Sequence, residues 1–400
     1  MAQQKINIVE GTYSLGLGGT EYVIQLFCKY FDKELFDVTV VCINTGGERV
    51  EIIEKLGCKV IILNKDLSLL GPILEKADVF HWHGAGTLDP TVFSIVEKNR
   101  PQLVLQTNVF GYYIDSPYYQ LLDYDLYVSK MILIRRIKHD QFDELFLSKR
   151  KVLHNPVDYD ELNRLAPSVD ALIEFKKANS LQDYFVVGRI GRADDVKFDL
   201  IALEGFARFI KTSKNSRFLL IGATPYILDY AGRLNITEYL LVFDNTPDLQ
   251  QLVIYYKCMD VFIAASNIGE SFGMVIAEAM SLAIPVLTVS TENNDNAQIE
   301  LVDNNVTGLV VKHDAEMVAF ALNHLYENPD LRRKFGANAQ KKVAEAYHAK
   351  KIAYSLQHLI LTHFEKHYTS KYRSLLLDYS IQMKDDYERR CGDLWPYEPI

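Results

Sequence analysis

Residues 260–280 have the sequence DVFIAASNIGESFGMVIAEAM, and a Pro-Val pair follows at 285–286. The apolar run at 261–264 is typical of a buried strand, and the turn after Ser266 ends where helical apolar spacing begins, near Phe272. A further β-branched run starts with the Pro-Val pair. This order of strand, turn, helix and strand predicts a parallel sheet covered by helices.

The same stretch supplies candidate ligand-binding groups. The first amides of a helix have no partner within the helix and lie at the positive end of its dipole, so they bind phosphate well. Glu270 is predicted at the mouth of this site and Glu278 on the helix, and carboxylates accept hydrogen bonds from the vicinal hydroxyls of sugars. The alternative for these two residues is a helix cap and a surface glutamate. The predicted phosphate-binding amides are those of Ser271, Phe272, Gly273 and Met274.

Similar strand-like runs recur along the whole chain, with helical stretches between them. One group predicts a first parallel sheet, and after a polar stretch near 158–180 a second group predicts another. The runs of the first group are 6–9, 38–43, 60–63, 79–81, 103–105 and 126–128, and those of the second are 184–190, 218–221, 240–243, 261–264, 286–289 and 309–311. The predicted fold class is therefore α/β, with two doubly wound, Rossmann-like domains.

Composition limits the classes of function. The 400 residues favour two domains, and a formal net charge of -9 disfavours a nucleic-acid partner. The five cysteines form no CxxC pair and are odd in number, which predicts neither a zinc site nor a disulfide framework and favours a cytoplasmic location. The N-terminus is predicted to be a strand, and no apolar run approaches the length of a membrane span.

Two further segments carry candidate phosphate-binding groups. Gly18 and Gly19 precede a helical stretch, so that backbone amides can approach an anion, although a plain tight turn is the alternative. A dinucleotide fingerprint is disfavoured because position 21 is Glu21 rather than glycine. Arg189 ends a predicted strand and Lys197 precedes the next helix, which places two cations at a sheet edge where a pyrophosphate can bind.

The segment from Glu270 to Met280 resembles the E-x7-E motif of retaining glycosyltransferases of the GT-B fold, particularly family 4. The resemblance runs from about residue 5 to 345. It includes the Gly-Gly-Thr-Glu at 18–21, the Val-Gly-Arg at 187–189 and the Thr-Gly at 307–308. It implies two Rossmann-like domains that face a cleft, an N-terminal acceptor-side domain at 1–158 and a nucleotide-sugar donor domain at 159–369. A helix at about 370–400 would rejoin the first domain.

The resemblance also implies roles for residues. Glu270 would face the donor sugar, Glu278 would bind the ribose, and Arg189 with Lys197 would hold the diphosphate. Gly18 and Gly19 would approach that diphosphate from the other domain. The base would be bound near Asn245. The implied activity is metal-independent, retaining transfer of a hexosyl unit, with no cofactor, from a nucleotide sugar such as a UDP-sugar to a glycan, lipid-linked or small-molecule acceptor.

On the acceptor side the sequence departs from the family. The family commonly has a histidine in the segment here occupied by Asn108 to Phe110, and this chain has none there. The His81-Trp82-His83 triplet places two imidazoles on one face of a strand, but no third metal ligand is evident. We predict instead that His83 lines the acceptor cleft as a second catalytic candidate beside Glu270. The Asp-Tyr-Asp triplets at 123–125 and 158–160 match a metal-binding pattern that arises easily in an acidic chain.

The stretch 130–151 combines apolar and basic residues. It predicts either core packing with a solvated basic face or peripheral contact with the inner face of an anionic membrane, and core packing is favoured. Two other functions remain open for the whole chain. One is a nucleotide-sugar epimerase on the same fold, and the other is a sugar-nucleotide binder without catalysis.

Overall fold

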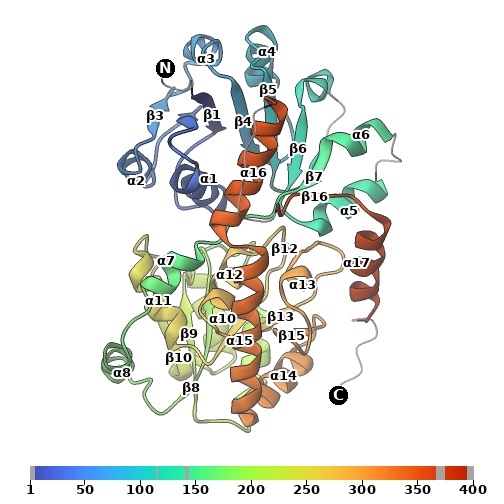
Figure 1. Ribbon diagram of the computed structural model, residues 1–400. Coiled ribbons are helices and arrows are strands. Elements are labelled where there is room, and N and C mark those ends of the chain that lie inside the picture. The colour runs from blue at the N-terminus through green and yellow to red at the C-terminus, as the bar shows by residue number, and fades with distance from the viewer. Residues whose placement is uncertain (1–4, 114–115, 140–143, 366–373, 394–400) are drawn as a thin grey trace. The chain divides into compact units, whose positions relative to one another are not determined.

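The computed structural model describes residues 5–113, 116–139, 144–365 and 374–393 (Figure 1). The chain divides into two compact units, each built around its own largely parallel sheet. Unit 1 comprises Met1–Pro156 and Tyr347–Lys384, and unit 2 comprises Val157–Ala346 and Asp385–Ile400. Every strand-like run predicted from the sequence forms a strand, with ends shifted by up to three residues.

The unit 1 sheet is parallel apart from one edge strand. Its order reverses between β1 and β4, as in a doubly wound fold. In spatial order the strands are β16 (Leu377–Asp378), β7 (Arg150–Val152), β6 (Tyr124–Tyr127), β5 (Leu103–Asn108), β4 (Val79–Gly84), β1 (Ile6–Thr12), β2 (Phe36–Cys42) and β3 (Lys59–Ile62). The helices are α1 (Gly19–Tyr30), α2 (Val50–Lys55), α3 (Leu70–Leu74), α4 (Pro90–Lys98), α5 (Lys130–His139), α6 (Glu144–Lys149) and α16 (Ala349–His363), with 3₁₀ turns at Leu67–Leu69 and Pro117–Leu121.

The unit 2 sheet is parallel throughout. Unit 2 also contains a separate parallel sheet of two short strands. In spatial order the strands are β10 (Leu240–Phe243), β9 (Ser216–Ile221), β8 (Phe185–Ile190), β11 (Val261–Ala264), β13 (Val286–Val289) and β15 (Gly308–Val311); the separate pair is β12 (Gly269–Glu270) and β14 (Asp295–Asn296). The helices are α7 (Tyr159–Arg164), α8 (Val169–Ala178), α9 (Ile201–Phe209), α10 (Pro225–Arg233), α11 (Leu249–Cys258), α12 (Met274–Ser281), α13 (Gln298–Leu301), α14 (Ala315–Glu327) and α15 (Pro329–Ala346), with a 3₁₀ turn at Thr237–Tyr239.

The strand order of unit 2 determines where a ligand can bind. The order reverses between β8 and β11, which are neighbours in the sheet although a long stretch of chain separates them. In open α/β sheets, ligands bind outside the carboxyl ends of the strands at such a reversal. Arg189 near the end of β8 and the loop after β11 therefore meet at the favoured position.

The C-terminal region corrects the predicted domain boundaries. The chain returns to unit 1 at Tyr347 rather than near 370, because Ile352, Leu356 and Ile360 of α16 are buried in the core against α1. Burying each of these side chains contributes about 1.5–3 kcal/mol. The predicted boundary at 158/159 lies within two residues of the observed one at Pro156.

The predicted helical tail at about 370–400 is also interrupted. Strand β16 pairs antiparallel with β7, with Leu377 opposite Val152, in a stretch where no sequence pattern predicts a strand. A two-residue strand is too short to carry a periodic pattern. Helix α17 (Ile381–Asp393) follows, and from Asp385 onward the chain groups with unit 2 rather than with unit 1.

The stretch 130–151 forms α5, α6 and the start of β7. Four consecutive apolar residues of α5 are at most 1% exposed, so they form part of the core and are unavailable to lipid. These residues are Met131, Ile132, Leu133 and Ile134. This agrees with the favoured prediction of core packing for the apolar part of the segment. Among the described residues, no helix is both long and apolar enough to cross a membrane.

Candidate functional site

Glu270 is held in place by a short strand pair. Glu270 lies opposite Asn296 in the β12–β14 pair, and its carbonyl oxygen accepts a hydrogen bond from the Ala297 amide at 2.8 Å. Gly269 has a φ of 70°, and a Cβ there would collide with the Asp295 carbonyl, so only glycine fits. The Glu270 side chain is 14% exposed and reaches the edge of the sheet.

Buried polar side chains fix the opposite strand of this pair. The Asn296 Oδ1 accepts the Thr291 amide at 3.0 Å, and the Gln298 Nε2 donates to the Thr291 Oγ1 at 2.8 Å. All three residues are buried. Because buried polar groups in a connected network rigidify their backbone, the position of Glu270 is determined by residues that the sequence did not single out.

Lys197 reaches Glu270 from a distant part of the sequence. Its Nζ donates to the Glu270 Oε2 at 3.1 Å. An isolated antiparallel bridge joins Phe198 to Ser266, and the Asn267 amide donates to the Lys197 carbonyl at 3.2 Å. The loop before α9 is therefore attached to the loop after β11. The Lys197 side chain remains 30% exposed, so it is accessible to a ligand.

Arg189 is a buried cation at the same edge. Only 4% of the residue is exposed, and its guanidinium lies over the Phe198 ring at 4.1 Å. Burial lowers the pKa of Arg189 to about 10, against the opposing effects of the Glu270 and Asp199 carboxylates, so it stays charged at neutral pH. Within the described part of the chain its Nη1 has no hydrogen-bond partner. An unsatisfied buried cation is costly, and it marks a position where an anion would be stabilised.

Helix α12 begins slightly later than predicted. Gly273 is its N-cap with a φ of 100°, and the amides of Ile276 and Ala277 are bonded to the Gly273 carbonyl. The amides of Met274 and its neighbours therefore lie at the helix N-terminus. The predicted start near Phe272 lies two residues before the observed first residue, Met274, and the Phe272 side chain is 2% exposed. Ser271 is partly exposed in the loop that leads from Glu270 to the helix.

Glu278 lies on the second turn of α12 and is held by a tyrosine. The Tyr256 hydroxyl, on α11, lies 2.8 Å from the Glu278 Oε2 and 3.2 Å from the Val275 carbonyl oxygen. Tyr256 is 1% exposed, so its ring is fixed in the core. No sequence signal identifies Tyr256, because its contact with Glu278 depends on where the fold places α11 and α12.

The Asn245 side chain holds the loop after β8. Its Nδ2 donates to the Gly191 carbonyl at 2.8 Å, and its Oδ1 accepts the Ala193 amide at 3.1 Å. Both ends of the amide thus hold the loop after β8, which carries the chain from Arg189 to Lys197. The Asn245 side chain thus stabilises the backbone around the site through these two hydrogen bonds.

In unit 1, the predicted glycines cap α1. Gly18 is the N-cap of the helix, and a Cβ at this position would collide with the Glu21 carboxylate. The carboxylate is the flexible end of its side chain, so a larger residue at 18 would displace it from the helix start. This carboxylate already interacts favourably with the positive end of the helix dipole. Gly19 is the first residue of α1.

His83 is not at a surface, which corrects its predicted place beside an acceptor. It is 2% exposed on β4, and its Nε2 lies 2.6 Å from the Glu10 Oε2 on β1. The His81 Nδ1 lies 3.0 Å from the same oxygen, and the His81 Nε2 lies 2.8 Å from the Thr107 Oγ1. Parallel pairing of β1 with β4 brings these side chains together on one buried face.

Glu10 is a third possible metal ligand beside His81 and His83, and no sequence pattern identifies it. Among the described residues, Glu10, His81 and His83 are the group whose ligand atoms lie close enough for one metal ion, within 4.8 Å of one another. Tetrahedral zinc with bonds of about 2.0–2.1 Å would separate its ligand atoms by roughly 3.3 Å. The separation of 2.6 Å between His83 and Glu10 fits a charge-assisted hydrogen bond instead.

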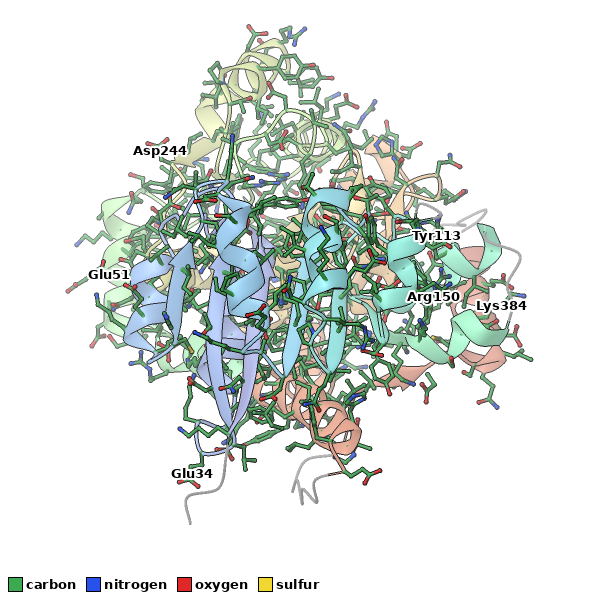
Figure 2. All side chains as sticks on the ribbon, turned by 90° about the horizontal axis from the view of Figure 1, so that it is seen from above. Glu34, Glu51, Tyr113, Arg150, Asp244 and Lys384 are labelled. Atoms are coloured by element: carbon green, nitrogen blue, oxygen red, sulfur yellow. The ribbon has the colours of Figure 1, made fainter. Side chains whose placement is uncertain are left out.

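The acidic triplet at 123–125 has structural partners. Asp123 pairs with Arg100 at 3.0 Å, and the buried Asp125 accepts from Gln106 at 2.9 Å and from Tyr119 at 3.1 Å. Arg150 donates to the same Tyr119 hydroxyl at 2.9 Å and lies over the Tyr113 ring at 5.3 Å (Figure 2). In the second triplet, Asp158 caps α7 by accepting the Glu161 amide. Asp123, Asp125 and Asp158 thus each have a structural contact.

The segment that lacks the family histidine is a tight loop after β5. Asn108 accepts the Gly111 amide at 2.7 Å, and Gly111 has a φ of 68°. This turn leaves Phe110 and Tyr112 at 40% and 56% exposure, with ring centroids 5.8 Å apart. Exposed aromatic rings at the carboxyl edge of a sheet offer apolar faces to a ligand.

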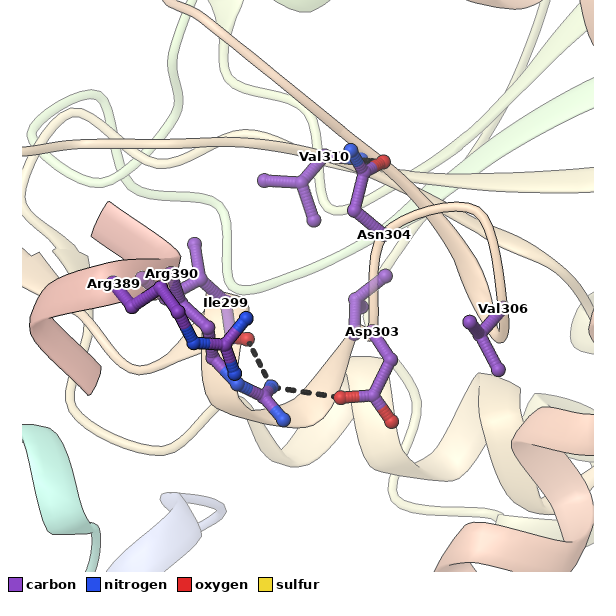
Figure 3. A pocket seen from close by; sticks show the side chains of 8 residues that line it. Ile299, Asp303, Asn304, Val306, Val310, Arg389 and Arg390 are labelled. Atoms are coloured by element: carbon purple, nitrogen blue, oxygen red, sulfur yellow. Dashed lines mark hydrogen bonds and ion pairs between the residues drawn. The ribbon is translucent and has the colours of Figure 1, made fainter. Parts of the chain in front are cut away.

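A pocket of about 440 Å³ lies elsewhere in unit 2 (Figure 3). Ile299 and Asp303 line it from one side and Arg389 and Arg390 of α17 from the other. Arg390 donates to the Asp303 Oδ1 at 2.7 Å and to the Ile299 carbonyl at 3.3 Å. The cationic heads are thus paired with acids, and none of the predicted site residues lines this pocket.

Comparison with known proteins agrees with this geometry. Residues 171–342 match the family model described as glycosyl transferases group 1. The chain is 27% identical over 196 residues to the capsular polysaccharide biosynthesis glycosyltransferase CapM of Staphylococcus aureus, a match that covers 48% of this chain and 49% of CapM. The chain thus spans about half the length of this curated relative.

Solved structures match over most of the chain. A glycosyltransferase from Rickettsia africae ESF-5 has a TM-score of 0.75 at 18% identity, covering 91% of this chain and 100% of that one. Anabaena Alr3699/HepE in complex with UDP-glucose has a TM-score of 0.73 at 16% identity, covering 89% and 100%. The two sheets therefore have the GT-B fold. Residues 171–342, which match the glycosyl transferases group 1 model, carry Arg189, Lys197, Glu270 and Glu278.

Proposed function

We propose that this chain is a retaining glycosyltransferase that moves a hexosyl unit from a nucleotide-diphosphate sugar, with UDP as the favoured nucleotide, to a hydroxyl of an acceptor. The observation that carries the proposal is that the Lys197–Glu270 pair lies at the same sheet edge as the Nη1 of Arg189, which has no hydrogen-bond partner in the described part of the chain. Two cations and one carboxylate at the strand-order reversal suit a ligand that has both a diphosphate and sugar hydroxyls.

Each group has a distinct task in this reaction. Arg189, Lys197 and the first amides of α12 bind the diphosphate and stabilise the charge that it gains as the anomeric C–O bond breaks. Glu270 accepts hydrogen bonds from the sugar hydroxyls and favours the positive charge that develops on the ring. Glu278, held by Tyr256, accepts the ribose hydroxyls.

Retention requires the acceptor to attack from the face that the diphosphate leaves. The departing phosphate oxygen can then take the acceptor proton while the new bond forms on the same face. This arrangement needs no protein base beside the acceptor. It is compatible with the burial of His83 and with the absence of a histidine at 108–110.

We also propose that the reaction needs neither a cofactor nor a divalent metal. The charge of the leaving diphosphate is met by Arg189, Lys197 and helix amides, and the acids of both Asp-Tyr-Asp triplets have structural contacts. UDP is favoured because Anabaena Alr3699/HepE, which has the same fold, was solved with UDP-glucose. Gly18 and Gly19 are proposed to approach the diphosphate through their backbone.

The acceptor is proposed to be a glycan, a lipid-linked sugar or a small molecule with a free hydroxyl. The exposed rings of Phe110 and Tyr112 support a sugar-containing acceptor, because apolar sugar faces stack on aromatic rings. The name of CapM, a capsular polysaccharide biosynthesis enzyme, supports the same class.

The test is a thermal-shift screen followed by product analysis. UDP, GDP, ADP and their sugars are compared, and a ligand at 100-fold its dissociation constant should add about 2.7 kcal/mol to the unfolding free energy. The stabilising sugar nucleotide is then incubated with and without glycan acceptors. A glycoside formed only with acceptor supports a transferase. An epimerised donor without acceptor would establish the epimerase instead, and binding without any product would establish a non-catalytic binder.

A further inference from the structure

Two cysteines that are far apart in the sequence meet in unit 1. Cys28 lies on α1 and Cys58 directly precedes β3, and the two thiols are close enough for each to shift the pKa of the other. The Cys58 Sγ also lies 3.8 Å from the Cys28 carbonyl oxygen. Neither is in a disulfide, and no sequence motif joins them. The pairing arises because α1 packs beside the β2–β3 edge of the sheet.

A lysine is fixed against this pair. The Lys33 Nζ donates to the Cys58 Sγ at 2.9 Å and to the Cys28 carbonyl at 2.6 Å. Gln357 of α16 also stabilises the turn that carries Lys33, because its Oε1 accepts a hydrogen bond from the Asp32 amide at 2.9 Å. The ammonium group is therefore positioned by backbone contacts rather than left free on a surface side chain.

The contacts favour a thiolate on Cys58. Hydrogen bonds from the Cys28 thiol and from Lys33, with the lysine charge, lower the pKa of Cys58 against the opposing effects of burial and Glu10. The bond to Cys58 and burial raise the pKa of Cys28, which keeps its proton. By contrast, burial raises the pKa of Cys42 to about 12 and that of Cys258 to about 11.

Access also separates Cys58 from its partner. Cys58 is 5% exposed and Cys28 is fully buried, so a molecule as small as a peroxide reaches Cys58 first. Thiolates next to a cation and close to the surface are the cysteines that oxidise, whereas buried neutral thiols are inert. A second thiol in contact then acts as the resolving group.

We propose that Cys58 is an oxidation site for hydrogen peroxide and that Cys28 resolves it to a disulfide. The Cys58 thiolate attacks one peroxide oxygen, so that an S–O bond forms, the O–O bond breaks, and hydroxide leaves and is protonated to water. Cys58 is thereby oxidised to a sulfenic acid and the peroxide is reduced. Cys28 then loses its proton and attacks the Cys58 sulfur, the S–S bond forms, the S–O bond breaks, and the second water leaves. The site is independent of the proposed transferase activity.

The test uses the full chain with Cys391→Ser, so that Cys42 and Cys258 serve as internal controls. The folded protein is treated with hydrogen peroxide, alkylated after denaturation and mapped by mass spectrometry. We expect a peptide pair linked through Cys28 and Cys58 that dithiothreitol separates, while Cys42 and Cys258 are alkylated as in untreated protein. Cys28→Ser should instead accumulate a sulfenic acid on Cys58, trapped with dimedone.

Lysine variants test the cause. Lys33→Met should slow oxidation about tenfold or more, because once the pKa of Cys58 lies above the assay pH its thiolate fraction falls tenfold for each further unit. Lys33→Arg should recover much of the rate, and Lys55→Met, which removes an exposed lysine of α2, should leave it unchanged. Oxidation of Cys42 or Cys258 as fast as Cys58, no linked peptide in the parent protein, or the parent rate in Lys33→Met would each overturn the proposal. Thermal melting of every variant identifies any that fails to fold, in which case the parent and Lys33→Arg decide.

Discussion

The Lys197 Nζ lies 3.1 Å from the Glu270 Oε2, although the two residues are 73 positions apart in the chain. The pair exists because the Phe198–Ser266 bridge attaches the loop after β8 to the loop after β11. Because the lysine and the glutamate already form an ion pair, they are positioned before a donor binds. This reduces the free-energy cost of ordering the site on binding.

Changing Glu270 to glutamine should chiefly lower turnover. The variant keeps the shape and the β12 backbone contacts but loses the charge that favours the developing positive charge of the sugar. We expect kcat to fall about 10 to 1,000-fold, with a smaller change in the donor KM. Steady-state kinetics with the donor varied measures both. Glu316→Gln, which removes an exposed partner of Arg208, is the matched control. An unchanged kcat in Glu270→Gln would remove this residue from the reaction.

Changing Arg189 to methionine should separate binding from stability. Among the residues that the structure describes, one nitrogen of the buried guanidinium has no hydrogen-bond partner, so its removal relieves a desolvation cost, while the methionine fills part of the space. We expect the Tm of the ligand-free variant to stay level or rise and the Kd for UDP to increase about 10 to 100-fold, on the scale of a charge-assisted contact. Calorimetric unfolding and titration calorimetry measure the two effects. A lower Tm with an unchanged Kd would mean that Arg189 is purely structural.

Glu278 should act on binding rather than on the chemical step. If it holds the ribose, it contributes equally in the ground and transition states, so Glu278→Gln should raise the donor KM and leave kcat nearly unchanged. Tyr256→Phe removes the hydroxyl that lies 2.8 Å from Glu278 and should raise the same KM by a smaller factor. A fall in kcat without a change in KM would contradict the assigned role.

The helices and strands could be predicted from the sequence more completely than the contacts between them. The β-branched runs determine the strands directly, and the order of strands and helices determines the parallel sheets, so the α/β class and the positions of Arg189 and Glu270 follow from local sequence. The contacts of Lys197 with Glu270, of Tyr256 with Glu278 and of Glu10 with His83 depend on which strands and helices adjoin, which no local pattern contains.

The errors have the same origin. The sequence predicts His83 at a cleft because the alternation of side chains along a strand does not distinguish a histidine on a buried face from one at the strand end. The return of the chain to unit 1 was placed near 370 because an apolar stripe on a helix does not identify the core that it joins.

The buried Glu10–His83 pair should make the stability depend on pH. The imidazoles lower the pKa of Glu10 to about 2 although burial opposes this, and burial with the neighbouring His81 lowers the pKa of His83 to about 4 although Glu10 opposes this. In both cases the unfolded chain binds a proton at a pH where the folded chain does not. The unfolding free energy therefore falls as the pH is lowered, from about 6.5 to 4 for His83 and from about 4.5 to 2 for Glu10.

Thermal melting between pH 7 and pH 4 measures this dependence. His83→Gln should melt at a lower temperature at pH 7 but should show a flatter decline between pH 6.5 and 4, because the proton-linked part is gone. His324→Gln, which changes an exposed histidine of α14, should keep the original slope. Equal slopes in the original protein and His83→Gln would show that His83 is not the linked group.

A chelator should leave the rate of transfer unchanged. In the proposed reaction Arg189, Lys197 and the α12 amides meet the charge of the diphosphate, so the removal of divalent ions should remove nothing that the reaction uses. Initial rates are compared with and without EDTA, before and after dialysis. Loss of activity that magnesium or manganese restores would assign a role to a metal and to acids outside the proposed site.

Proton NMR of the purified glycoside gives the anomeric configuration of the product directly. With a UDP-hexose whose anomeric configuration is known, same-face attack at the site formed by Arg189, Lys197 and Glu270 yields a product with that configuration, and its formation is strongly reduced in Glu270→Gln. A product of inverted configuration, or equal formation by Glu270→Gln, is incompatible with the proposed reaction.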